Sequence, residues 1–119
     1  MSFNGTWANA DGSLALIISN AGMDGSFEGK LTYGGNSYPL QNGHWHIGDT
    51  PGATYSFAIS VDGSNQIYIG ASGVITGSDL GGGMPSQITI AGAAATLKGS
   101  APTPPNSLSL FAGILNPQN

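Results

Sequence analysis

The chain contains no cysteine, only two basic residues and few charged residues of any kind. Without cysteine it has no disulfides, no thiolate chemistry and no thiolate zinc site. Two basic residues against six carboxylates leave almost nothing to neutralise a phosphate backbone, so nucleic acid is not expected as a partner. The same charge balance disfavours attachment to an anionic membrane surface.

Long apolar runs are also missing. The longest, Leu14 to Ile18, is far too short to cross a bilayer, so no membrane insertion is expected. No apolar segment led by lysine or arginine opens the sequence, which predicts a chain that is cytoplasmic as synthesised and leaves later release from the cell open. The 119 residues suit a single domain spanning positions 1–119.

The chain is rich in turn signals, with 20 glycines and seven prolines recurring at short intervals. No stretch shows the sustained period of an amphipathic helix, and about eight strand-length segments lie between the turns. In one of them Tyr55, Phe57, Ile59 and Val61 alternate with small polar residues. The sequence therefore predicts an all-β fold, an eight-stranded antiparallel up-and-down barrel.

Groups for general acid–base or nucleophilic catalysis are scarce. Glu28 and Lys30 lie two residues apart on a predicted strand, where they would form a surface ion pair. The aspartates fall in predicted turns, where they would cap their own backbone: Asp11, Asp24, Asp49, Asp62 and Asp79. We therefore expect no enzyme activity and no cofactor.

The segment His44-Trp45-His46 has the spacing of two metal ligands on one face of a strand. Two imidazoles are too few for a tight site, and a third ligand would have to come from Asp49 or a neighbouring strand or subunit. The prediction is two exposed histidines flanking an inward tryptophan rather than a metal site, with a metalloenzyme at His44 and His46 as the weakest of the options left open.

The segment Gly5 to Ser13, GTWANADGS, resembles the first strand and turn of the avidin and streptavidin family. The likeness extends loosely to Gly25–Gly29, Tyr38–Gly43 and Gly52–Val61. It implies the barrel of that family and a ligand pocket at one barrel end, where biotin's ureido group is held by residues that correspond here to Asn9 and Ser13.

The pocket walls differ from those of the family. Positions that hold tryptophan in the family correspond here to Phe57, to Ala71 or Tyr68, to Gly92 or Ala93, and to Ser107. The aspartate after the family's last-strand glycine is replaced near Gly113 by aliphatic residues. Because aromatic walls supply most of the apolar burial in such a pocket, biotin binding is expected to be weak or absent.

These observations predict a non-catalytic protein that binds a small molecule or a glycan at the open barrel end. The residues expected there are Asn9, Ser13, Tyr33, Phe57 and Tyr68. Two alternatives stay open: a multivalent lectin that uses the loops of one barrel end, and a structural barrel whose interior is filled by Leu16, Ile18, Phe57, Ile59 and Ile69.

A nearly uncharged strand face predicts self-association. The residues are Thr54, Ser56, Ala58, Ser60, Ser107 and Ser109, with Leu108 and Leu110 assigned to the opposite, core-facing side of the last strand. Interface cores are depleted of charge, so the sequence predicts a homodimer or homotetramer with barrel-face contacts.

Overall fold

The computed structural model describes residues 4–22, 24–47, 54–62, 67–78, 84–96 and 107–118. These ranges contain strands and turns. Within them there is no helix long and apolar enough to cross a membrane. The strands are β1 (Gly5–Ala8), β2 (Leu14–Ser19), β3 (Glu28–Tyr33), β4 (Asn36–Pro39), β5 (Asn42–Ile47), β6 (Thr54–Asp62), β7 (Ile67–Ser78), β8 (Met84–Thr96) and β9 (Ser107–Gln118).

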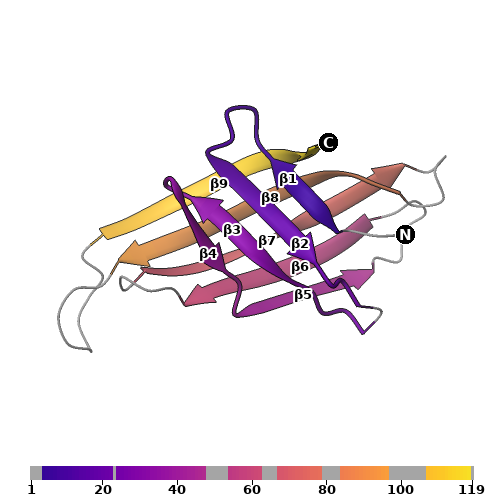
Figure 1. The fold of residues 1–119 in the computed structure, drawn as a ribbon, viewed down its shortest axis with the longest axis horizontal. Coiled ribbons are helices and arrows are strands. Elements are labelled where there is room, and N and C mark those ends of the chain that lie inside the picture. The colour runs from indigo at the N-terminus through magenta and orange to yellow at the C-terminus, as the bar shows by residue number, and fades with distance from the viewer. Residues whose placement is uncertain are drawn as a thin grey trace.

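All neighbouring strands pair antiparallel in the order β4-β3-β2-β1-β9-β8-β7-β6-β5. In Figure 1 strands β1 to β4 cross in front of strands β5 to β9. The residues just before β3 pair with β5, because the Phe27 N–H donates to the Gly43 carbonyl at 3.0 Å and the Trp45 N–H to the Gly25 carbonyl at 2.7 Å. These bonds close the curled sheet by joining the segment that leads into β3 to the edge strand β5, and they confirm the predicted antiparallel barrel.

The described residues form nine strands where about eight were expected. The additional strand arises because the segment 36–47 bends between β4 and β5. At the bend the Leu40 N–H donates to the Gly29 carbonyl of β3, whereas the next N–H, from Gln41, donates to Ser60 of β6, both at 2.9 Å. β4 and β5 are therefore two halves of one bent strand, which reconciles the count with an eight-stranded barrel.

The core lies inside the barrel and follows the alternation predicted for β6. Tyr55, Phe57, Ile59 and Val61 are buried, while the intervening Ser56 and Ala58 are exposed. The other proposed interior residues, Leu16, Ile18 and Ile69, are buried as well. Apolar side chains therefore line the middle of the barrel.

The prediction for β9 was wrong about which side faces the core. Leu108 and Leu110 are 64% and 79% exposed, whereas Leu115 is fully buried and Phe111 is half-buried. Alternation from Leu115 puts Ser107 and Ser109 on the side of Phe111 and both leucines on the outside. Of the small residues predicted to form an outer interface, Ser56, Ala58 and Ser60 do lie outside; the side chain of Thr54 is not among those described.

Candidate functional site

A cavity of about 310 Å³ opens at the barrel end where β1 turns into β2 and β3 into β4. Its lining consists of Asn9, Ser13, Leu14, Tyr33, Gly34, Phe111 and Ala112. Three of the residues expected at a ligand site, Asn9, Ser13 and Tyr33, therefore come together in one place. They are brought there by two neighbouring hairpin turns and are joined by Phe111 of β9.

The β1–β2 turn is held by its own polar side chains. Leu14 N–H donates to Asn9 Oδ1 at 3.1 Å, and Asn9 Nδ2 donates to Ser13 Oγ at 3.1 Å. The hydroxyl of Ser13 donates in turn to Asp11 Oδ1 at 2.7 Å. A further side-chain hydrogen bond from Asn9 helps to lower the pKa of Asp11, so the polar side chains of Asn9, Asp11 and Ser13 are engaged with one another in the turn.

These bonds to Ser13 also perturb Asp11. The side-chain hydrogen bond from Ser13, followed by the bond from the Ser13 backbone N–H, holds the pKa of Asp11 below its usual value. A lowered folded-state pKa means that the bonds are fully present above the unfolded-state pKa and are lost as the pH falls through the folded-state value. The turn that shapes the cavity is therefore expected to loosen only in acid.

Replacing Ser13 by alanine is expected to raise the pKa of Asp11 toward that of an ordinary aspartate, because the strongest hydrogen bond to the carboxylate disappears. An NMR titration of the aspartate side chains measures this shift. Asp24 is the internal control, because its pKa is lowered in the same way by Ser26, in a different turn. An unchanged titration of Asp11 in the Ser13→Ala variant would show that Ser13 does not hold this carboxylate.

The apolar side of the cavity consists of two aromatic rings. The ring centroids of Tyr33 and Phe111 are 5.0 Å apart, with an interplanar angle of 43°. Phe111 also fills space above a small-residue position, since a Cβ added to Gly92 would lie 2.7 Å from its Cζ atom. Phe111 is not among the residues that the sequence predicts at the site. The signal that could have found it is the -Leu-Phe-Ala-Gly- run of the last strand, but the prediction that Leu108 and Leu110 face the core puts Phe111 on the outside.

Phe57 and Tyr68, also expected at the ligand site, do not line the cavity. Phe57 is only 4% exposed and belongs to the core. Tyr68 is 41% exposed and lies on the outer face of β7, because the alternating residues Ile67 and Ile69 face inward. A ligand contact by either residue stays a prediction, and it would require a site other than this cavity.

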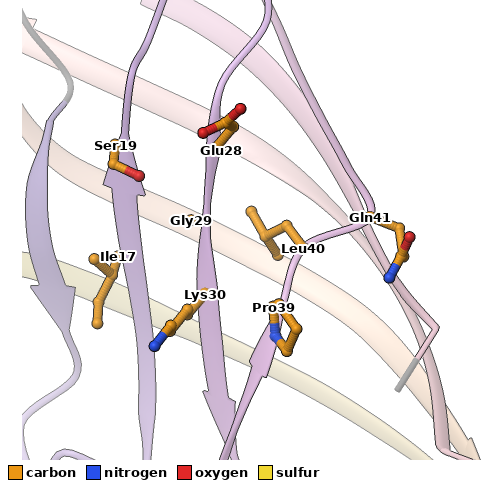
Figure 2. A pocket seen from close by; sticks show the side chains of 8 residues that line it. All are labelled: Ile17, Ser19, Glu28, Gly29, Lys30, Pro39, Leu40 and Gln41. Carbon is orange, nitrogen blue, oxygen red and sulfur yellow. The ribbon is translucent and has the colours of Figure 1, made fainter. Parts of the chain in front are cut away.

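A wider hollow of about 550 Å³ lies on the outside of β2, β3 and the β4–β5 bend (Figure 2). Its floor is apolar, with Ile17, Pro39 and Leu40, and its charged residues are Glu28 and Lys30. These two side chains point away from each other in Figure 2, and among the described residues no ion pair joins them. The predicted pair is wrong: Glu28 instead accepts a hydrogen bond from Asn20 Nδ2 at 2.9 Å.

The two histidines of β5 are exposed on the outer side, and Trp45 packs inward against the edge of Tyr55 at 5.7 Å between centroids. His44 and His46 border a shallow hollow of about 230 Å³ with Ser56 and Ala58. No group of three potential metal ligands exists among the described residues. Asp49 and Asp79 lie outside the residues that the structure describes.

The remaining aspartates are partly as predicted. Asp24, like Asp11, accepts bonds from its own turn, with the Ser26 hydroxyl at 2.7 Å and the Ser26 N–H at 3.0 Å. Asp62, expected in a turn, instead ends β6. Neither lies at the end cavity, whose lining contains no titratable residue besides Tyr33. The cavity thus offers hydrogen bonding and aromatic contact rather than proton transfer.

No protein-family model and no curated protein matches the chain. Solved structures do match it. A biotin-binding protein from chicken aligns with a TM-score of 0.69 over 99% of this chain and 97% of that one, at 14% identity. Xenavidin aligns with a TM-score of 0.67 over 98% and 97% of the two chains, at 16% identity. The chain therefore has an avidin-like fold, and at such low identity the likeness is one of fold alone.

Proposed function

We propose that this protein is a non-catalytic binding protein that takes a small molecule at the end cavity. The observation that carries the proposal is the meeting of Asn9, Ser13, Tyr33 and Phe111 around one cavity. A polar turn beside two aromatic rings suits a small ligand with a flat, partly apolar body that also carries a hydrogen-bonding group. The named ligand of the chicken structural neighbour, biotin, makes a cyclic urea a reasonable first probe.

The volume of the cavity limits the size of the ligand. A ligand can bury in this cavity only what fits into about 310 Å³ at the barrel end. Ligand sites that bury most of a drug-sized molecule run from about 300 to 1,000 Å³, so this cavity is at the lower limit. It suits a small ring, or one end of a longer molecule.

Biotin itself is expected to bind weakly, with a dissociation constant above 1 μM. The turn offers at most a pair of hydrogen bonds, each worth about 0.5–1.5 kcal/mol net. The missing indole walls remove apolar contact worth a few kcal/mol at about 25 cal/mol per Å². Calorimetric titration measures the constant, and a submicromolar value would mean that the cavity is completed by residues assigned here to other roles.

The site itself is tested with 2-imidazolidinone, the simplest cyclic urea, in an NMR titration. Backbone amide shifts are expected at Asn9, Ser13, Gly34 and Phe111, saturating in the millimolar range. The Asn9→Ala variant should lose them, while Asn36→Ala, at the start of β4 and outside the lining, should keep them. Shifts confined to other residues, or none, would contradict a site at this end.

A lectin remains the alternative ligand class, in which the loops of the same barrel end contact a sugar. A glycan array distinguishes it from the cavity binder. Binding to a glycan that survives both the Asn9→Ala and the Tyr33→Phe substitutions would favour the lectin. Binding to neither cyclic ureas nor glycans would favour the structural barrel with a packed interior.

A further inference from the structure

The wider hollow on the outside of β2, β3 and the β4–β5 bend brings together an acid and a base in a chain with few charges. The sequence has two basic and six acidic residues, and one of each, Lys30 and Glu28, lines this outer hollow. Both side chains are exposed, and no described residue forms an ion pair with either. The outer hollow therefore presents one negative and one positive charge to a ligand.

Gly29 lies between the two charged residues. A Cβ on Gly29 would overlap the Ile17 carbonyl oxygen, so only glycine allows β2 and β3 to come this close. The Glu28 and Lys30 side chains on either side of it point away from each other in Figure 2. Since Cα atoms two residues apart on a strand are about 6–7 Å apart, the two charged groups are about 7 Å apart or more.

The surface beside the charges is apolar. The strand registers set Lys30 opposite Ile17 on one side and opposite Pro39 on the other. Leu40 lies beside Gly29, because its N–H donates to the Gly29 carbonyl at 2.9 Å. Ile17 and Leu40 are half-buried, so a ligand that covers their remaining surface removes apolar area from water.

The carboxylate of Glu28 is held in place but not used up. Asn20 Nδ2 donates to Glu28 Oε2 at 2.9 Å, which restrains the side chain at the end of β2. A carboxylate accepts several hydrogen bonds, so Glu28 can receive an ammonium group as well. The ammonium group of Lys30 has three donors for a carboxylate.

We propose that the outer hollow binds a short peptide with free termini and apolar side chains, its ammonium group at Glu28 and its carboxylate at Lys30. The spacing selects this class of ligand. A single amino acid carries both charged groups on one carbon, too close together to reach both residues. Each further residue of an extended chain adds about 3.3–3.6 Å, so a tripeptide spans the distance.

The size of the outer hollow agrees with such a ligand. Its volume of about 550 Å³ lies within the range of about 300–1,000 Å³ that is usual for small-molecule sites. The outer hollow shares no lining residue with the end cavity. The proposal is therefore independent of what the end cavity binds.

The test is an NMR titration of the protein with the tripeptide Ala-Leu-Ala. Backbone amide shifts are expected at Ser19, Glu28, Lys30 and Gln41, saturating in the millimolar range. The N-acetylated and the C-amidated forms of the peptide should each bind about two- to fivefold more weakly, as the loss of an exposed ion pair implies. Free leucine should bind more weakly than any of them.

Two variants assign each charge to one end of the peptide. Lys30→Met should bind the free and the C-amidated peptide equally, and Glu28→Gln should bind the free and the N-acetylated peptide equally. The control is Asp24→Asn, which also removes one charge but lies outside the lining and should keep both preferences. The dispersion of the amide spectrum checks that each variant is folded.

Three results would each overturn the proposal. The first is a wild type whose amides at the outer hollow do not shift with the tripeptide. The second is a wild type that binds the capped peptides or free leucine as well as the free tripeptide. The third is a Lys30→Met or Glu28→Gln variant, correctly folded, that keeps the preference of the wild type for the corresponding free terminus.

Discussion

Replacing Leu16 by alanine is expected to lower the free energy of unfolding by about 2–5 kcal/mol, one of the two largest losses predicted for a single substitution in this chain. Leu16 has no exposed surface and lies on β2 between its cross-strand neighbours Trp7 on β1 and Leu31 on β3. Both neighbours are buried, so the structure cannot collapse easily into the space that the lost methyl groups leave.

Urea unfolding followed by circular dichroism measures the change. The matched control is Ile17→Ala, because Ile17 is the next residue of the same strand and faces the outer hollow, only half-buried. The expected loss there is about 1 kcal/mol or less, in line with the smaller burial. Equal losses at the two positions would mean that Leu16 does not lie in the packed interior.

The Gly73→Ala substitution is expected to destabilise the barrel by about 1–3 kcal/mol or more, although it adds a single methyl group. Gly73 faces inward, and a Cβ there would overlap the Thr89 carbonyl oxygen and lie 2.9 Å from Cε1 of Phe57. Relief would require β7 and β8 to separate locally or the buried ring to move. Both responses disturb the centre of the core.

The comparison is Gly70→Ala, three residues earlier on the same strand, where a Cβ meets nothing within 4 Å. That variant is expected to be neutral or more stable by up to about 1 kcal/mol, since alanine loses less conformational entropy than glycine on folding. Unfolding should be measured at low protein concentration, so that association does not enter the comparison. A harmless Gly73→Ala variant would contradict the close approach of β7 and β8.

The sequence predicted the barrel and the inward face of β6 because bulky apolar residues alternate there with small polar ones over the whole strand. In β9 the alternating Leu-Ser pattern was just as regular but misleading. A pattern of period two says that one face differs from the other, not which face is inside, and a shift of one residue reverses the assignment. In β9 the burial of Leu115, near the C-terminal end of the strand, shows which face is inside.

The residues of the candidate site that lie in or beside the first two hairpin turns could be predicted from the sequence. Asn9 and Ser13 flank a turn that the sequence shows, and Tyr33 ends a strand that leads to the neighbouring turn. Phe111 is distant in sequence, and its contact with Tyr33 depends on how β9 closes the barrel beside β1. Tyr68 lies away from this cavity because it is on the outer side of β7, which the aromatic pattern did not reveal, and its ligand contact stays a prediction.

The absence of the predicted ion pair between Glu28 and Lys30 also has a cause that the strand pattern does not show. Glu28 and Lys30 flank Gly29, whose φ of 155° lies outside the usual strand region. At that residue the backbone departs from regular strand geometry, and its carbonyl accepts a hydrogen bond from the Leu40 N–H. Strand spacing alone assumes a regular strand.

The ladder between β1 and β9 has a consequence for how the protein is made. Thr6 pairs with Gln118, so the first and last described strands are neighbours in space and separated by nearly the whole described chain. During synthesis β1 leaves the ribosome long before β9, so the edge of β1 that pairs with β9 stays unpaired until β9 has been made. Contacts of such long sequence separation slow folding and leave nascent chains prone to aggregation. Synthesis rate and chaperone supply are therefore expected to govern the yield of this barrel more than its final stability does.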